Sequence, residues 1–466
     1  MRGWPRDRDR RIPEPVCDGC GVSTSAAPPQ PVAPDRGLRT FARGSGSGGA
    51  WRATWLTVSS SRLLVWVAGI VAGAVSSFTI PPGVRAAPLG LVRGLGSVGE
   101  VLAGPAARWD AGFFLLVAKQ GYQFNLGAAT GDRVAFFPLY PLLIRIGGVL
   151  LPLVVAGILV SILALAAGLY GLYRLTALEV STGTLKTAAT PDRVARLTIL
   201  LLAFSPMAFF LSAIYSESLF LALSIWLFWC ARQGRWALVG VLGALATLTR
   251  APGLLLAVPA LFLYLYGPRT DAAPRLREAA AAPARLSGRV LAALRPRYPL
   301  RWDLAWFGLI PLALVAFCAW VALEGGHWNA PLTVEGHFWN RHLTDPLVTL
   351  WHGAKLTATQ IAHHDGHAWI GLSVLLTLAA TVGVFRRLPL AYGLYATIGF
   401  LLPFTQAVPG EPLLSVPRFM LVVFPIWIWL AAWLLERPRL IYPVLVLFAL
   451  AMMGFTAAFS TWAFVA

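Results

Sequence analysis

Long, uninterrupted apolar runs alternate along the chain with short polar or arginine-bearing connections. A membrane-spanning helix needs about 20 apolar residues, and about eleven runs approach or exceed this length. The runs cover residues 62–80, 152–174, 197–213, 214–231, 235–250, 252–267, 304–323, 368–385, 388–404, 418–435 and 440–463. Strands of a membrane β-barrel would alternate apolar and polar positions, and these runs do not. The pattern therefore predicts an all-α polytopic membrane protein, a bundle of about 11 transmembrane helices, with about two more or fewer also compatible.

The composition supports a membrane protein. The chain has 466 residues, of which 57% are hydrophobic and 12% are charged. A soluble protein carries about 25% charged residues, so a soluble enzyme and a disordered chain are excluded. The net charge of +18 would suggest a nucleic-acid partner in a soluble protein. Here the basic residues are mostly arginines between apolar runs, as the positive-inside rule predicts, so we expect no nucleic acid.

The positions of the arginines predict the orientation of the chain. Residues 1–61 are rich in Arg, Pro, Gly and Ser, and we interpret them as a disordered cytoplasmic tail before a transmembrane domain of residues 62–466. If residues 136–151 lie along the membrane, the tail, the Arg-rich 268–303 connection and the shorter Arg-bearing connections all face the cytoplasm. The His-rich 324–367 loop then lies outside. If 136–151 crosses the membrane instead, the charge bias inverts.

The outer face then receives the chain's unusual charged residues, beginning with amphipathic helices in the first extracytoplasmic loop, 81–151. These residues are Arg108, Asp110, Glu217, Arg250 and Arg418. Ionisable residues at membrane depth are functional candidates by default, although snorkelling or a structural ion pair is the alternative for each of them. Asp110 begins a predicted helix that Gly121 ends, and helix capping alone would explain an aspartate there.

Four blocks of sequence carry a resemblance to a known family. The first joins Arg108-Trp109-Asp110 and Gly121-Tyr122 to Phe136-Phe137-Pro138-Leu139-Tyr140-Pro141. The others are 205–220 with Tyr215-Ser216-Glu217-Ser218, 246–253 with Thr249-Arg250, and 418–425, which begins with Arg418-Phe419. In order and spacing the blocks resemble the PIG-V family of GPI mannosyltransferase 2-like enzymes and its bacterial relatives, over residues 105–435. Ala251-Pro252 departs from the family, in which Ser-Asn is common.

The resemblance implies a GT-C class membrane glycosyltransferase. Such an enzyme would move mannose from a polyprenyl-phosphate donor to a lipid or glycan acceptor on the extracytoplasmic face, with inversion. This chemistry needs a carboxylate to take the proton of the acceptor hydroxyl and cations to hold the leaving phosphate. Asp110 is the expected base, and Glu217 is a second catalytic carboxylate that orients the acceptor or pairs with an arginine.

Arginines and aromatic residues complete the predicted site. The expected phosphate ligands are Arg250, Arg418 and Arg108, because a guanidinium offers forked donors to a phosphate. The aromatic residues expected to line the sugar or lipid groove are Trp109, Tyr122, Phe136, Phe137, Tyr140 and Tyr215. Anchoring at the membrane interface is the alternative for each aromatic residue.

All seven histidines lie in the 324–367 loop. The densest group is His363-His364-Asp365-Gly366-His367, but its spacing matches no closed metal motif. We therefore expect no metal and no other cofactor, with a divalent ion as the alternative. The stretch 336–341 is a candidate for contact with the acceptor.

Other functions fit parts of the sequence. A secondary transporter predicts an inverted repeat, which the sequence does not show. A non-catalytic partner in a glycan pathway would not need Asp110. A related GT-C enzyme that moves another sugar, or that uses a protein acceptor, would use the same residues and stays open. The sequence has no glycine-rich nucleotide-binding motif, which argues against a soluble nucleotide sugar as the donor. It does not indicate an oligomeric state.

Overall fold

The computed structural model describes residues 47–76, 96–124, 131–272, 295–338, 340–463 and 465. The chain divides into two compact units, Met1–Ser47 and Gly48–Ala466, and all described residues except Ser47 belong to the second. The described residues of this unit form α-helices and short 3-10 helices, together with one two-stranded sheet.

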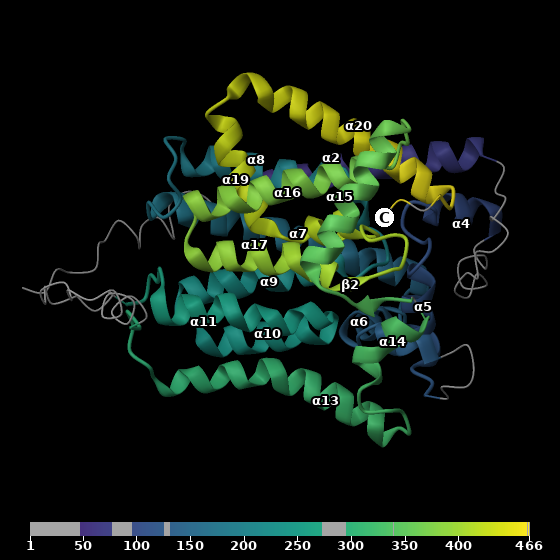
Figure 1. Ribbon diagram of the computed structural model, residues 1–466, viewed down its shortest axis with the longest axis horizontal. Coiled ribbons are helices and arrows are strands. Elements are labelled where there is room, and N and C mark those ends of the chain that lie inside the picture. The colour runs from purple at the N-terminus through teal and green to yellow at the C-terminus, as the bar shows by residue number, and fades with distance from the viewer. Residues whose placement is uncertain are drawn as a thin grey trace, which may run out of the picture. The chain divides into compact units, whose positions relative to one another are not determined.

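Five helical stretches are long and apolar enough to cross a membrane, counted over the described residues. They are α2 (Ser47–Val75), α7 (Leu153–Ser181), η4 with α13 (Trp302–Gly308 and Leu309–Leu323), α16 (Ala368–Arg387), and η6 with α20 (Pro438–Leu440 and Ile441–Ser460). Figure 1 shows the axes of α13 and α16 nearly parallel, with the chain running in opposite directions. Because each stretch corresponds to a predicted apolar run, the structure confirms an all-α polytopic membrane protein.

The remaining predicted runs are shorter or interrupted. Their elements are α8 (Pro191–Ala203), η2 (Ala208–Leu211), α9 (Glu217–Arg232), α10 (Trp236–Thr249), η3 (Ala251–Leu256), α11 (Ala257–Tyr266), α17 (Leu390–Leu401), η5 (Leu402–Thr405), α18 (Val416–Leu421) and α19 (Phe424–Leu435). Pro206 and Pro252 lie at two of the interruptions, since proline lacks the amide hydrogen that a helix needs. The 13 residues of α8 are about 20 Å long, less than the hydrocarbon core of about 30 Å. A count of 11 spanning helices is therefore not confirmed.

Short elements gather at one end of the bundle. They are α4 (Gly96–Ala103), α5 (Ala111–Gln120), η1 (Gly131–Ala135), α6 (Leu139–Gly147), α14 (Ala330–Phe338), β1 (His342–Leu343), α15 (Pro346–Ala362) and β2 (Gln406–Ala407). Strands β1 and β2 pair antiparallel, with His342 opposite Ala407. Figure 1 shows α5, α6, α14 and β2 close together at this end.

The predicted 324–367 loop contains two helices, α14 and α15. The start of α15 follows from its sequence, because the Asp345 side chain accepts hydrogen bonds from the amides of Leu347 and Val348. Pro346 occupies the first helical turn, where its missing amide hydrogen has no consequence. The loop is therefore a helical cap with a short strand rather than an irregular segment.

The predicted boundary of the tail at residue 61 is wrong. Helix α2 begins at Ser47, so residues 47–61 are helical. Ala50, Ala53 and Val58 are buried and extend the packed face of the helix beyond the apolar run. Residues 1–46, the rest of the predicted disordered tail, lie outside the described residues.

A buried ion pair lies at the C-terminal end of α9. Arg232 donates from Nε to Glu179 Oε1 at 2.5 Å, and Tyr392 donates to the same oxygen at 2.6 Å. Arg232 also donates to the Pro268 carbonyl at 2.6 Å. These bonds join the ends of α7 and α9 to the start of α17 and to the segment after α11, and so fix the far end of the bundle.

Candidate functional site

Four of the predicted site residues meet at the end of the bundle that carries the short elements. Asp110 directly precedes α5, Glu217 begins α9, Arg250 follows α10, and Arg418 lies in α18. Arg418 forms ion pairs with both carboxylates, from Nη1 to Asp110 Oδ2 at 2.8 Å and from Nε to Glu217 Oε1 at 2.6 Å. Arg250 Nη1 reaches the same Glu217 oxygen at 2.6 Å. The chain therefore brings two carboxylates and two guanidinium groups into one cluster, which we call the charged cluster.

The two carboxylates of the charged cluster differ in exposure. The Glu217 side chain is fully buried, whereas that of Asp110 is 31% exposed. Arg250 and Arg418 lie between these limits, at 15% and 12%. A buried carboxylate is tolerated when it is paired and hydrogen-bonded, and Oε1 of Glu217 accepts from both arginines. Asp110 is thus the carboxylate that an incoming molecule can reach.

Asp110 does not act as a helix cap. It occupies the N-cap position of α5, but its side chain makes no capping hydrogen bond. This corrects the expectation that Asp110 caps the helix, and the reason is that its carboxylate turns instead to Arg418. The predicted end of the helix at Gly121 is confirmed, with φ of 75° in the region that glycine tolerates best.

The backbone around Asp110 is held in an uncommon conformation. Trp109 has φ of 52°, a region that bulky residues rarely adopt. The Asp110 amide donates to the Tyr215 hydroxyl at 3.1 Å, and this hydroxyl donates to the Arg108 carbonyl at 3.1 Å. Tyr215 therefore fixes the turn that aims Asp110 at Arg418. Ser415, three residues before Arg418, also has positive φ, at 64°.

Arg108 does not join the charged cluster. Its guanidinium donates to the carbonyls of Ser460 at 3.0 Å and Ala107 at 3.3 Å, and it lies 4.9 Å from the centre of the Trp462 ring. Burial lowers the pKa of Arg108 to about 10, against the opposite effect of the Glu100 charge. The residue therefore ties the turn before α5 to the end of α20, and the structure does not bring it to Arg250 and Arg418.

The predicted groove aromatics fall into two groups. Phe136, Phe137, Tyr140 and Tyr215 are buried, while Trp109 and Tyr122 are half-buried. The Tyr215 ring lies under Arg418, with the guanidinium carbon 4.5 Å from its centre, as in a cation–π contact. The buried rings are therefore part of the packing that supports the site. Of the six predicted groove aromatics, only Trp109 and Tyr122 are exposed enough to contact a substrate.

Tyr140 supports the site through a chain of hydrogen bonds. Its hydroxyl lies 2.6 Å from Ser161 Oγ, which donates to the Ala213 carbonyl at 2.7 Å. Ala213 lies just before the turn that leads to Glu217. Tyr140 thus joins α6 and α7 to the segment that places the buried carboxylate.

Arg62 is a supporting residue that the sequence analysis did not single out. It is buried in the middle of α2 and donates to the carbonyls of Ala203 at 2.9 Å and Ala208 at 2.7 Å, and to Ser212 Oγ at 2.8 Å. These acceptors surround the break between α8 and η2, where carbonyl groups lose their helical partners. A lone arginine in an apolar helix was the signal, but Arg62 lay at the predicted boundary of the tail.

Phe419 connects the charged cluster to the segment before β1. The guanidinium carbon of Arg250 lies 5.1 Å from the centre of the Phe419 ring, and that of Arg341 lies 5.9 Å from it. Arg341 belongs to the stretch expected to contact the acceptor, and it directly precedes His342 in β1. Arg341, the last residue of that stretch, therefore lies beside the charged cluster.

The histidines do not assemble into a metal site among the described residues. No group of three or more His, Cys, Asp or Glu side chains that could hold a metal ion occurs there. His367 pairs with Asp365 at 2.8 Å on the exposed surface between α15 and α16. The side chains of Glu335 and His337 lie outside the described set.

Part of the chain is similar in sequence to known proteins. Residues 76–266 match the family model described as Mannosyltransferase (PIG-V). The chain is similar to proteins named GPI alpha-1,6-mannosyltransferase 2, with 37% identity over 180 residues for the protein from Rattus norvegicus and 35% over 159 residues for that from Mus musculus. These matches cover 37% and 33% of this chain.

The chain spans about a third of the length of these curated relatives, 34% and 31% respectively. The matched family segment includes Asp110, Glu217 and Arg250 and ends before Arg418. The part of the chain that supplies three of the four charged residues thus matches the PIG-V mannosyltransferase family, which confirms the resemblance drawn from the sequence.

Proposed function

We propose that the protein is a membrane mannosyltransferase that moves mannose from a polyprenyl-phosphate donor to a hydroxyl of a lipid or glycan acceptor, on the extracytoplasmic face and with inversion. The observation that carries the proposal is the double ion pair of Arg418 with Asp110 and Glu217. It joins a reachable carboxylate to guanidinium groups, and the family match gives the class of sugar.

In the proposed step, Asp110 takes the proton of the acceptor hydroxyl. The acceptor oxygen attacks C1 of the mannose as the bond between C1 and the phosphate oxygen breaks. The electron pair of that bond stays on the phosphate, which leaves as polyprenyl phosphate. The partial exposure of Asp110 supports this role, because a general base must come within hydrogen-bonding distance of the proton it removes.

Arg250 and Arg418 hold the leaving phosphate in this mechanism. A guanidinium has five N–H donors, and within the described part of the chain the bonds to the two carboxylates use one donor of Arg250 and two of Arg418. The other donors can bind phosphate oxygens while Glu217 retains its ion pairs. Charge developing on the phosphate is stabilised by cations that are already in place.

Glu217 is a positioning residue in this scheme rather than a second base. One of its oxygens accepts from both arginines, and its side chain is inaccessible. It fixes the separation of the two guanidinium groups and partly neutralises them before the donor binds. This assignment refines the sequence-based expectation that Glu217 is catalytic.

The test is mannosyl transfer by purified protein in nanodiscs, with polyprenyl-phosphate [³H]mannose and a membrane lipid extract. Asp110→Asn keeps the shape of the side chain and removes the proton acceptor, so transfer should fall by about 10²–10⁴. The KM for the donor should change little, because Glu217 still holds both arginines. Asp192→Asn, at an exposed pair with Arg196, is the matched control.

Asp110→Ala should also lose transfer activity. Because the Asp110 side chain makes no capping bond, this substitution should not cause the helix destabilisation that follows the loss of a true cap. Near-normal transfer by Asp110→Asn would remove the base from the mechanism. Absence of transfer by the wild type with this donor would remove the donor assignment.

A further inference from the structure

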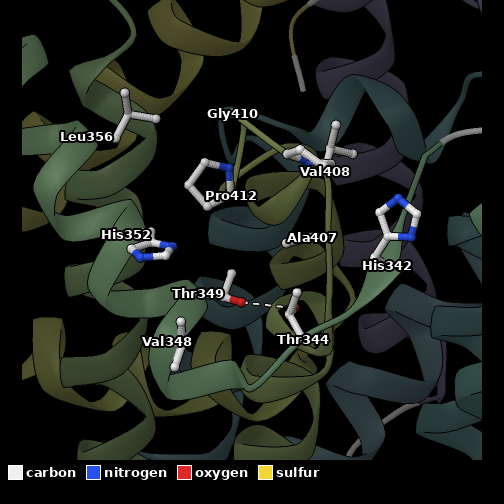
Figure 2. A pocket seen from close by; sticks show the side chains of 11 residues that line it. His342, Thr344, Val348, Thr349, His352, Leu356, Ala407, Val408, Gly410 and Pro412 are labelled. Carbon is white, nitrogen blue, oxygen red and sulfur yellow. Dashed lines mark hydrogen bonds between the residues drawn. The ribbon is translucent and has the colours of Figure 1, made fainter.

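A second site lies beside the charged cluster and differs from it in chemistry. A pocket of about 380 Å³ opens between α15, β1 and the loop after β2. It is lined by His342, Thr344, Val348, Thr349, His352, Leu356, Ala407, Val408, Pro409, Gly410 and Pro412. Figure 2 shows His352 and His342 on opposite sides of the pocket, with Thr344 and Thr349 between them. Its volume is at the small end of ligand pockets, which hold about 300–1,000 Å³.

The polar side chains of the pocket carry hydroxyls and imidazoles. Thr349 donates to Thr344 Oγ1 at 3.0 Å, and Thr344 donates to the Phe404 carbonyl at 3.1 Å, which leaves oxygen lone pairs on both hydroxyls. His342 Nε2 bonds Asn340 Oδ1 at 2.8 Å. Among the described residues, the His352 ring has no hydrogen-bond partner, so both of its nitrogens are available to a ligand.

The lining has no carboxylate, ammonium or guanidinium group. None of the eleven lining residues is Asp, Glu, Lys or Arg, in contrast to the charged cluster. Valine, leucine and proline side chains make up the rest of the wall. Hydroxyls and imidazoles beside C–H surfaces match a neutral, hydroxyl-rich ring better than an anion.

The pocket is joined to the charged cluster at two points. His342 directly follows Arg341, whose guanidinium lies over the Phe419 ring that Arg250 also contacts. On the other wall, the chain runs from Pro412 through Ser415, which has φ of 64°, to Arg418 in α18. Two short segments of chain therefore connect the pocket walls to the residues proposed to bind the donor phosphate.

We infer that this pocket binds the hydroxyl-rich head of the acceptor, a sugar or a sugar-like ring. The inference rests on the proposed function. The charged cluster takes the donor phosphate, and the pocket takes the acceptor. His352 and Thr349 are specificity-determining residues in this arrangement.

The test uses the full chain in nanodiscs and saturation-transfer NMR with two small probes, methyl α-mannopyranoside and methyl phosphate. The wild type should give a signal with both probes. His352→Leu and Thr349→Val should weaken methyl α-mannopyranoside binding about tenfold, as expected for one lost hydrogen bond, and leave methyl phosphate binding unchanged. His363→Leu, on the exposed residue that follows α15, is the matched control.

Transfer kinetics provide the second measurement. The two pocket variants should raise the KM for the acceptor about tenfold with little change in kcat or in the KM for the donor. Octyl α-mannopyranoside separates a lipid-borne head from a free glycan. If the KM for octyl α-mannopyranoside is well below that for methyl α-mannopyranoside, the acceptor is a lipid. If the two KM values are equal, the acceptor is a glycan. Either result agrees with the proposed pocket.

The outcomes separate the pocket from the proposed function. Unchanged mannoside binding by both pocket variants, or loss of methyl phosphate binding instead, overturns the assignment of the pocket even if transfer is measured. If the two pocket variants lose mannoside binding but the wild type transfers no mannose, the pocket is supported and the proposed function is overturned. Asp110→Asn should bind methyl α-mannopyranoside as the wild type does.

Discussion

The residue that organises the charged cluster is Arg418, because within the described part of the chain it alone forms ion pairs with both carboxylates. Glu217 is shared between Arg418 and Arg250, while Asp110 has Arg418 as its ion-pair partner among the described residues. Loss of Arg418 would therefore free Asp110 completely and leave Glu217 with one partner. Loss of Arg250 would leave the Asp110 pair intact, so the two arginines should not be equivalent in mutation experiments.

We expect Arg418→Ala and Arg250→Ala to raise the KM for the polyprenyl-phosphate donor by at least tenfold, since a charge-assisted hydrogen bond contributes about 1.5–3 kcal/mol. Arg418→Ala should also lower kcat, because the position of Asp110 depends on it. Lysine at either position should restore only part of the affinity, as it lacks the forked donors. The measurement is donor titration of transfer in nanodiscs.

Arg196→Ala removes an exposed arginine from α8 and is the control for these variants. Normal donor KM in both alanine variants would mean that the arginines are only structural partners of the carboxylates.

For single residues, the sequence predicted the members of the cluster but not the contacts that each side chain makes. The family-like blocks selected Asp110, Glu217, Arg250 and Arg418, and the structure brings all four together. The same blocks selected Arg108, whose side chain turns to α20. Whether a side chain turns toward or away from a neighbour depends on backbone angles such as that of Trp109, which a residue pattern does not specify.

Among the secondary structure elements, the interrupted helices matter most for the site. The break between α8 and η2 would leave carbonyl groups without partners, and Arg62 of α2 supplies donors to two of them. The same arginine reaches Ser212, near the turn that begins α9 and places Glu217. A side chain from the first described helix thus maintains the geometry of a site built from later ones.

Arg62→Met should lower thermal stability and transfer together, because it removes the buried hydrogen bonds to the Ala203 and Ala208 carbonyls and to Ser212 Oγ, and an unsatisfied buried group costs about 1–3 kcal/mol. Arg62→Lys should retain an intermediate stability, since an ammonium has three donors but not the spread of a guanidinium. The measurement is the midpoint of thermal unfolding by fluorescence-detected size exclusion.

Arg52→Met changes an exposed arginine on the same helix and should match the wild type. Unaltered stability of Arg62→Met would show that the break in the helix is maintained without this residue.

The apolar runs predicted where helices occur, but not where they are interrupted. Hydropathy is the same on both sides of a break, so runs such as 197–213 and 418–435 look continuous although each comprises two pieces. Proline in these runs was visible in the sequence. Its effect depends on whether neighbouring groups such as Arg62 compensate the lost hydrogen bonds, and this requires the tertiary structure.

For the whole molecule, the two ends of the bundle carry different charged groups. The charged cluster lies at one end, and the Glu179–Arg232 pair lies at the other. Arg386 and Arg387 form the last turn of α16, close in sequence to Tyr392, which bonds Glu179. The proposed orientation, with this end in the cytoplasm, follows from the positive-inside rule.

Single cysteines introduced into a chain without its four native cysteines test this orientation. His363→Cys, beyond α15, should react with a membrane-impermeant maleimide in intact cells. Arg437→Cys, between α19 and η6, should react only after the membrane is permeabilised. Both positions are exposed, so a difference in labelling reflects the side of the membrane. The reverse pattern would place the charged cluster in the cytoplasm and overturn the proposed orientation.

For the whole molecule, the apolar runs and the composition were enough to predict an all-α membrane protein. They were not enough to give the number of crossings, because α8, α10 and α19 are apolar but short. Nor did they predict the pocket beside α15, which forms when β1 pairs with β2 across more than sixty residues of chain. Contacts between such distant segments leave no periodic signal in the sequence.

The length of α9 has a consequence for how deep the chemistry occurs. Glu217 is its first residue and Arg232 its last, and each is part of a buried ion pair. Sixteen residues rise about 22 Å from first to last, and any tilt brings the two charged layers still closer along the membrane normal. The hydrocarbon of a bilayer is about 30 Å thick, so at least one layer lies below the level of the lipid headgroups. If that layer is the charged cluster, a lipid-borne phosphate descends toward the arginines, and the prenyl chain never has to leave the bilayer.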